Sequence, residues 1–211
     1  MMLAEQVATF YPDLMDERFE SAFAIYHQRY STNTFPQWWL AQPFRMLAHN
    51  GEINTLNGNV NWMKSHEIRM ASGAFGDMAE DIKPIIPSGT SDSGALDAVF
   101  EVLVRSGRNA PMAKTMLVPE AWSKQTSNMP KAWADMYSYC NSVIEPWDGP
   151  AALAMTDGRW VCGGLDRNGL RPMRYVITGD GLLIAGSEAG MVPGDEATVR
   201  EKGALGPGQM I

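Results

Sequence analysis

The sequence predicts a mixed α+β domain, in which helices and antiparallel strands are formed by different stretches of the chain. Apolar residues recur at helical spacing through the middle of the sequence, and short apolar runs separated by turn residues fill its last third. Runs joined by tight turns favour hairpins over the parallel sheet of a doubly wound protein. We therefore expect strands, then helices, then strands within one domain.

The composition is that of an ordered globular chain. Its 211 residues suffice for one large domain with a sizeable core, and 45% of them are hydrophobic and 19% charged. A net charge of −7, with 17 basic and 24 acidic residues and no basic run, argues against nucleic acid as a partner. The sequence has neither an apolar run long enough to span a membrane nor the pattern of a signal peptide, which predicts a soluble chain that is not exported.

Cysteines and histidines are few. The chain has two cysteines, Cys140 and Cys162, and three histidines, which are too few for a disulfide framework or a Cys/His metal site. Both cysteines lie in predicted elements, where a free thiol packs as a small hydrophobe. A reducing, cytoplasmic compartment fits this composition, and we expect no metal.

One helix and two strands are predicted in the first 50 residues. Leu3, Val7 and Phe10 follow helical spacing. Partly alternating aromatic residues predict a strand over 23–30, and a second strand is expected over 44–48. Each strand runs into a polar loop, which is where functional residues are commonly carried.

Three helices are predicted in the middle of the chain. The first has apolar residues at positions 53, 56, 60 and 63, with Glu52 in its first turn, where the helix dipole favours a carboxylate. The second has the strongest pattern: Ser91 or Asp92 caps it, apolar residues occupy positions 96, 99, 100 and 103, and it ends at Gly107. A third helix is expected over 128–140.

The last third of the chain is predicted to form an antiparallel meander. Its apolar runs cover 151–155, 160–163, 173–177 and 182–185, and turns rich in Asp, Asn and Gly separate them. The sequence starts within a helical pattern and stops at 205–211, where a Gly- and Pro-containing turn is followed by two apolar residues. We expect these residues to be part of a longer protein.

Three polar clusters follow predicted elements and supply complementary chemistry. They are residues 29–34, which begin with Arg29, residues 49–52 around Asn50 and Gly51, and residues 90–93 around Asp92. An arginine binds a carboxylate through two parallel hydrogen bonds, and an aspartate binds an ammonium group. An asparagine amide beside a glycine N–H stabilises a carbonyl oxygen that becomes negatively charged. Together these groups would hold a free amino acid.

Each cluster also has a purely structural interpretation. Arg29 is equally consistent with a surface or ion-paired arginine. Asn50-Gly51 is the pattern of a tight turn, because both residue types tolerate positive φ. Asp92 is a common type of helix cap, and a cap can also bind a ligand. Spacing along the chain leaves both interpretations open.

The order of the three clusters and the amino-acid sequences around them resemble those of one protein family. The stretch 26–62 closely resembles the glutaminase domain of glutamate synthase large subunits, which are class II (N-terminal nucleophile) glutamine amidotransferases. It includes Arg29-Tyr30-Ser31-Thr32, Phe35-Pro36-Gln37-Trp38-Trp39 and His49-Asn50-Gly51-Glu52. The similarity continues through Ser88-Gly89-Thr90-Ser91-Asp92-Ser93, Glu145-Pro146-Trp147-Asp148-Gly149-Pro150 and Leu165-Asp166-Arg167-Asn168-Gly169-Leu170-Arg171-Pro172. It therefore covers essentially all of residues 1–211.

This resemblance implies a fold, a substrate and roles for the clusters. The fold would be the four-layer αββα arrangement of Ntn hydrolases, truncated at the N-terminus, and the substrate L-glutamine. Arg29 would bind the α-carboxylate of glutamine, Asp92 its α-amino group, and Thr32 would line the same pocket. Asn50 and Gly51 would form the oxyanion hole over the side-chain amide. No catalytic role is expected for residues 166–172, which belong to the core sheet in related amidotransferases.

The nucleophile of this family is a cysteine at the mature N-terminus, whose own α-amino group serves as the base. The sequence begins Met1-Met2-Leu3, and neither Cys140 nor Cys162 supplies an α-amino group. We therefore expect the nucleophile to lie upstream of these residues, which would make them a partial domain that is inactive alone. An alternative hypothesis is a non-catalytic glutamine-binding or interaction module.

The resemblance further implies the partners of a larger enzyme. Ammonia from glutamine would pass through a channel to 2-oxoglutarate, which would be aminated and reduced to glutamate in ammonia assimilation. The parent would use FMN, an iron–sulfur cluster and electrons from NAD(P)H or ferredoxin, none of them bound by residues 1–211. Its partners would be the rest of the large chain and a small subunit, in the cytoplasm or, for a plant or alga, in the plastid.

Overall fold

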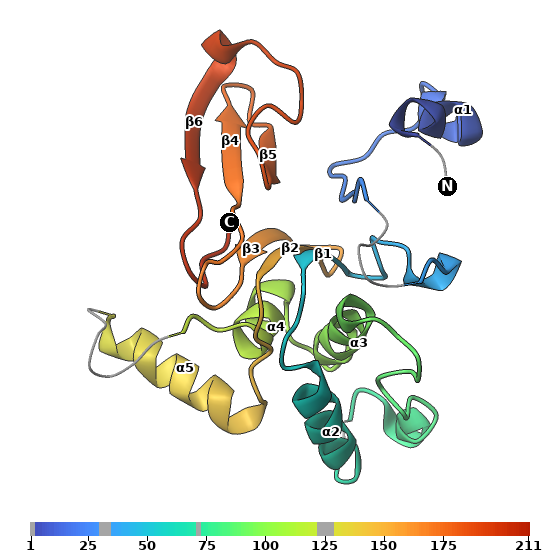
Figure 1. Ribbon diagram of the computed structural model, residues 1–211, viewed down its shortest axis with the longest axis vertical. Coiled ribbons are helices and arrows are strands. Elements are labelled where there is room, and N and C mark those ends of the chain that lie inside the picture. Colours follow the sequence, from blue (N-terminus) through green and yellow to red (C-terminus); the bar gives the residue numbers. More distant parts are fainter. Residues whose placement is uncertain (1–2, 30–34, 71–72, 122–128) are drawn as a thin grey trace.

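The computed structural model describes residues 3–29, 35–70, 73–121 and 129–211, and it confirms the mixed α+β class (Figure 1). The α-helices of the described residues are α1 (Val7–Phe10), α2 (Leu56–Glu67), α3 (Asp92–Arg105), α4 (Ala110–Leu117) and α5 (Lys131–Val143). The strands are β1 (Leu47–Gly51), β2 (Ala151–Thr156), β3 (Val161–Leu165), β4 (Arg174–Thr178), β5 (Leu183–Gly186) and β6 (Val199–Ala204).

The strands form two antiparallel sheets. Sheet A has the order β1-β2-β3, and sheet B has the order β5-β4-β6. In sheet A, Asn50 of β1 lies opposite Ala152 of β2, although helices α2 to α5 separate the two strands in sequence. The end of the chain borders β3, where Gly163 and Ile211 exchange backbone hydrogen bonds of 2.9 and 2.8 Å. Sheet A is therefore assembled from three distant parts of the sequence.

Helices α3 and α4 cover one face of sheet A and form the main core with it. The apolar stripe of α3 buries Leu96, Val99 and Phe100, each only 1% exposed. Strand side chains alternate between faces, so Leu47 of β1 and Met155 of β2 both join this core. Full burial of a side chain of this size stabilises a fold by about 1.5–3 kcal/mol. The helix layer thus fixes β1, the strand that carries Asn50 and Gly51.

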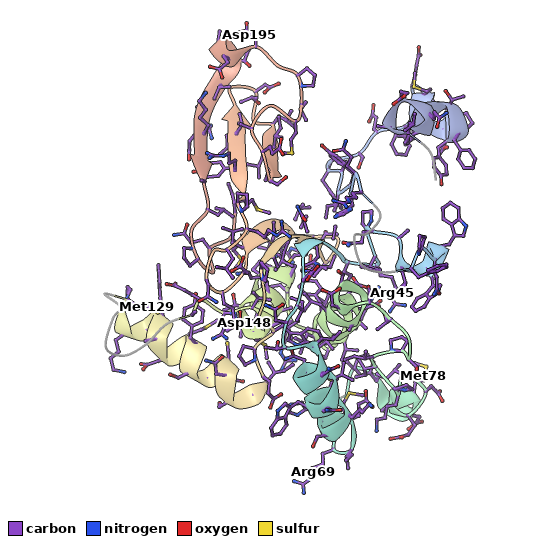
Figure 2. The ribbon with its side chains drawn as sticks, viewed as in Figure 1. Arg45, Arg69, Met78, Met129, Asp148 and Asp195 are labelled. Atoms are coloured by element: carbon purple, nitrogen blue, oxygen red, sulfur yellow. The ribbon has the colours of Figure 1, made fainter. Side chains whose placement is uncertain are left out.

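Sheet B extends away from the helices, and none of its strand residues is fully buried (Figure 1). Figure 2 shows its side chains projecting into open space, with Asp195 at its far end. A small second cluster of Ala152, Leu165 and Met173 lies on the other face of sheet A. The described residues form two sheets and a helix layer over sheet A, and the four-layer αββα stacking stays a prediction.

Most predicted elements are confirmed with shifted bounds. The helix predicted from residue 53 begins at Leu56, so the placement of Glu52 in its first turn is wrong. The reason is that the backbone of Glu52 continues the hydrogen-bond pattern of the sheet, because its N–H donates to the carbonyl oxygen of Pro150 at 2.9 Å. The strand predicted over 44–48 lies at Leu47–Gly51, and the helix predicted over 128–140 lies at Lys131–Val143.

Two further predictions need correction, and two elements were not predicted. The strand expected over 23–30 is absent from residues 23–29, because no strand of the described residues lies beside them and an isolated strand has no hydrogen-bond partner. The single meander is instead divided between the two sheets. Neither α4 nor β6 is predicted from the sequence, since α4 is short and three charged residues interrupt the apolar pattern of β6. None of the described helices has the length and apolar character to cross a lipid bilayer.

Candidate functional site

The turn before β2 packs tightly against the end of β1. A Cβ atom on Gly51 would lie 1.8 Å from the carbonyl oxygen of Pro150, and one on Gly149 would lie 2.0 Å from the carbonyl oxygen of Glu52. Such distances leave no room for any side chain, so both positions require glycine. The turn therefore fixes the path of the backbone at Gly51.

The register of sheet A determines which way the Asn50-Gly51 donors face. Because Glu52 donates its N–H to Pro150, the even-numbered residues of β1 exchange hydrogen bonds with β2. The N–H of Gly51 therefore points away from β2, toward the outer edge of the sheet. The Asn50 side chain is exposed on the face opposite the helices. No hydrogen bond to its carboxamide is found among the described residues.

Asp92 is the first residue of α3 and contacts the segment that follows β1. Its Oδ2 accepts a hydrogen bond from the N–H of Ile53 at 2.8 Å. The cap of α3 is Ser91, whose hydroxyl accepts the N–H of Gly94 at 3.1 Å. The structure thus assigns the capping bond to Ser91, and the half-buried carboxylate of Asp92 instead binds the backbone two residues after Gly51.

A second aspartate of α3 holds the other end of β1. The buried carboxylate of Asp97 accepts the N–H of Met46 at 3.0 Å and, more weakly, that of Arg45 at 3.4 Å. Figure 2 labels Arg45 beside α3, where its guanidinium also pairs with Glu101. Burial raises the pKa of Asp97 despite these hydrogen bonds. Helix α3 therefore binds β1 through a carboxylate at each end of the strand.

His49 lies between these two contacts and is only 2% exposed. Its Nδ1 lies 2.8 Å from the hydroxyl of Ser93, and its Nε2 is buried with no hydrogen-bond partner among the described residues. Burial lowers the pKa of His49 to about 4; the charge of Asp92 opposes this shift, and those of His27 and Arg171 add to it. The imidazole is therefore neutral near pH 7.

A buried loop supports the far side of the turn before β2. The carboxylate of Asp166, 1% exposed, accepts the N–H of Ala151 at 3.1 Å and those of the loop residues that follow it. Burial acts to raise the pKa of Asp166, but these backbone hydrogen bonds outweigh it and the pKa is lowered. Arg167 in the same loop donates to Asp148 at 3.0 Å. Figure 2 labels Asp148, whose carbonyl accepts the N–H of Asn54 at 2.8 Å.

The third cluster is less well supported by the fold. Arg29 is exposed in a stretch without regular structure, and its guanidinium has no hydrogen bond or ion pair among the described residues. The ring of His27 hydrogen-bonds the Arg29 carbonyl. Thr32 lies outside the described residues. The structure therefore joins Asp92 to the N–H of Ile53, two residues beyond Gly51, and gives the Arg29 guanidinium no hydrogen bond or ion pair to this segment among the described residues.

The two cysteines have the properties of structural thiols, not of a reactive nucleophile. Cys140 in α5 and Cys162 in β3 are both buried in the main core, and burial raises the pKa of each thiol. No group of three or more His, Cys, Asp or Glu side chains that could hold a metal is found among the described residues. Sequence reasoning did not assign a role to His49 or Ser93; strand alternation, which turns His49 toward α3, is the signal that could have indicated one.

Comparison with known proteins places these residues in a family. The family model described as "Glutamine amidotransferases class-II" matches residues 1–211. The chain is 72% identical over 212 residues to "Glutamate synthase [NADPH] large chain" of Azospirillum brasilense, and this covers 100% of the chain and 14% of that relative. It is 51% identical over 207 residues to "Glutamate synthase [NADH]" of Saccharomyces cerevisiae, covering 98% of the chain and 10% of that relative. The chain thus spans about a seventh or less of the length of these relatives.

The similarity of this structure to a solved structure is weaker than the sequence similarity to these relatives. A solved structure of glutamine phosphoribosylpyrophosphate (PRPP) amidotransferase from B. subtilis, complexed with ADP and GMP, aligns at 21% identity and a TM-score of 0.29. The alignment covers 66% of this chain and 21% of that one. A score this low carries no argument about the present fold.

Proposed function

The chain belongs to the class II glutamine amidotransferases, and we propose that residues 1–211 are part of a glutaminase domain that binds L-glutamine and helps to release its amide nitrogen as ammonia. The observation that carries this proposal is the 2.8 Å hydrogen bond between Asp92 and the N–H of Ile53. It joins the start of α3 to the backbone two residues beyond Gly51, which brings a carboxylate close to the segment that carries the Asn50-Gly51 donors. This proximity supports a shared ligand.

Each group has a chemical task in this proposal. The Asp92 carboxylate uses one lone pair for Ile53 and has others free for the α-ammonium of glutamine. The guanidinium of Arg29 binds the α-carboxylate, with Thr32 lining the same pocket. The N–H of Gly51 and the carboxamide of Asn50 donate to the amide oxygen as it becomes an oxyanion. The outward direction of the Gly51 N–H and the unengaged Asn50 side chain support this assignment.

The nucleophile is proposed to be a cysteine outside residues 1–211. Its thiolate attacks the side-chain amide carbon, the tetrahedral oxyanion collapses with release of ammonia, and water then hydrolyses the thioester to glutamate. Cys140 and Cys162 are unsuited to this role because both are buried in the core with raised pKa values.

The larger protein is proposed to be a glutamate synthase that assimilates ammonia. In it, ammonia passes through an internal channel to 2-oxoglutarate, whose reductive amination gives glutamate. The names of the two relatives described above specify NADPH and NADH, and ferredoxin is a further candidate donor. FMN and an iron–sulfur cluster would be held by other parts of the chain, and a small subunit would join them. The location proposed for the complex is the cytoplasm, or the plastid for a plant or alga.

The test is a glutaminase assay on the full-length chain that contains these residues. Release of glutamate and ammonia from glutamine is measured for the wild type, for Asp92→Asn and for Asp13→Asn, which removes the same charge at an exposed position. We expect Asp92→Asn to lower kcat/KM about 100-fold, since it removes the partner of a bound ammonium, and Asp13→Asn to leave it unchanged. Absence of glutaminase activity in the wild type, or full activity in Asp92→Asn, would refute the proposal. Glutamine binding without hydrolysis would support a non-catalytic module instead.

A further inference from the structure

We propose that His49 and Ser93 are positioning residues for Asp92, which hold its carboxylate in the orientation that receives the α-ammonium of glutamine. The inference rests on the proposed function, because it concerns the same site. Neither residue is expected to touch the substrate. His49 lies on the face of sheet A that the helices cover, whereas the Asn50 side chain lies on the other face.

A chain of hydrogen bonds connects the three side chains. His49 Nδ1 lies 2.8 Å from Ser93 Oγ, and Ser93 Oγ lies 3.3 Å from Asp92 Oδ1. The other carboxylate oxygen of Asp92 accepts the N–H of Ile53 at 2.8 Å. Both carboxylate oxygens of Asp92 are therefore held. The backbone after β1 holds Oδ2, and Ser93, which is itself hydrogen-bonded to His49 of β1, holds Oδ1.

Counting protons fixes the direction of these bonds. An ionised carboxylate only accepts hydrogen bonds, so the single hydroxyl proton of Ser93 is donated to Asp92. The Ser93 oxygen is then an acceptor toward the ring, and Nδ1 of His49 must carry a proton and donate it. Burial keeps the ring neutral near pH 7, with its pKa lowered to about 4, so Nε2 carries the lone pair. The imidazole thereby orients the hydroxyl toward Asp92.

Packing alone does not account for an imidazole at this position. The ring is 2% exposed, and its Nε2 is buried without a hydrogen-bond partner among the described residues. An apolar side chain of similar size would fill the same space without leaving a buried polar atom unpaired. What the imidazole adds, within the part of the chain that the structure describes, is its bond to Ser93.

The experiment measures KM for glutamine and kcat of glutaminase separately in the full-length chain. The variants are Ser93→Ala, His49→Leu, their combination, and His49→Asn, whose amide N–H can replace that of Nδ1. The matched control is Ser91→Ala, which removes the neighbouring hydroxyl that caps α3 and that makes no hydrogen bond to the Asp92 carboxylate among the described residues. Asp92→Asn is measured alongside.

We expect Ser93→Ala and His49→Leu each to raise KM about tenfold with kcat within about twofold, as loss of uniform substrate binding does. The double variant should resemble either single one, because both break the same chain of bonds. His49→Asn should restore KM to within about threefold of the wild type, and Ser91→Ala should not raise it.

Three results would overturn the inference without touching the proposed function. Two of them are an unchanged KM in Ser93→Ala while Asp92→Asn is impaired, and equal increases of KM in Ser93→Ala and Ser91→Ala. A KM increase in His49→Leu that His49→Asn does not rescue also counts against it, because packing would then be responsible. If Asp92→Asn itself is fully active, the proposed function fails instead.

Discussion

The two halves of the proposed glutamine site differ in how the fold supports them. Asn50, Gly51 and Asp92 lie where β1, α3 and the turn before β2 meet, and backbone hydrogen bonds fix each segment. Arg29 lies on a stretch without regular structure, where Phe23 is 40% and Tyr26 65% exposed. Residues of one proposed site therefore need not share one source of rigidity. The half built on sheet A is fixed by the packing of these residues, whereas no comparable packing of the described residues holds Arg29.

The largest effect is expected from Gly51→Ala, which breaks the supported half. The new methyl group would lie 1.8 Å from the Pro150 carbonyl oxygen, so the backbone must move and displace the N–H proposed for the oxyanion hole. We expect kcat of the full-length chain to fall about 1,000-fold in a glutaminase assay, the scale of losing one such donor.

The control for this variant is Gly58→Ala on the exposed side of α2, where a Cβ atom meets nothing within 4 Å. It should retain activity and stabilise the helix by about 1 kcal/mol. Equal activity of the Gly51 and Gly58 variants would show that the tight contact at Pro150 does not matter for catalysis.

The supported half should also respond to acid, through His49. Its pKa is lowered from 6.5 to about 4 by burial, so the unfolded chain takes up a proton first as pH falls. Stability is therefore fully present above pH 6.5 and is lost as pH falls toward 4, by about 2 kcal/mol at pH 5.

Hydrogen exchange of peptides that cover residues 44–53, compared at pH 7 and pH 5 and corrected for intrinsic exchange, measures this loss. In His49→Asn the part of the loss that comes from this titration should vanish. The account of His49 is contradicted if both proteins lose the same protection.

A third prediction sharpens the contrast between the halves. Arg29→Ala and Asp92→Asn should each lower kcat/KM for glutamine about 100-fold, because each removes one charge partner of the substrate. Only Asp92→Asn should loosen the protein itself, raising exchange at Ile53 about tenfold, since it weakens a hydrogen bond worth about 1.5 kcal/mol. If Arg29→Ala increases exchange in β1 as well, the two halves are structurally coupled and do not differ in their support as proposed.

The smallest effect is expected at the ion pair between Arg167 and Asp148, which supports the turn before β2 from outside. Its side chains are 19% and 31% exposed at a separation of 3.0 Å, so Arg167→Gln should destabilise the turn by about 1 kcal/mol. The matched control is Lys131→Gln, which breaks a more exposed pair with Asp135 in α5, with side chains 86% and 63% exposed, and should change nothing measurable. Hydrogen exchange of peptides that cover residues 148–151 compares the two variants. Identical exchange rates would show that Arg167 does not support the turn before β2.

Local patterns predicted the parts of the site, while its assembly depended on contacts between distant segments. Helix α3 could be predicted because Ser91 and a regular apolar stripe identify its start and buried face. Asn50, Gly51 and Asp92 could be selected from their chemistry alone. That Asp92 meets Ile53 follows from the packing of α3 on β1 and from the pairing of β1 with a strand four helices later, neither of which spacing reveals.

The errors have related causes. The strand predicted over 23–30 is absent from residues 23–29, because alternation indicates a strand only where another strand pairs with it. The position of His49 depends on the true bounds of β1, three residues later than predicted at each end. Once those bounds are known, alternation places His49 toward α3 and Asn50 on the opposite face.

The most direct test of the central claim, that Asp92 and the Asn50-Gly51 donors form one glutamine site, is a crystal structure of the full-length chain with L-glutamate bound. The account predicts the α-ammonium within hydrogen-bond distance of the Asp92 carboxylate, and a side-chain carboxylate oxygen within the same distance of the Gly51 N–H. Glutamate bound elsewhere, or bound here with its α-ammonium away from Asp92, would contradict it.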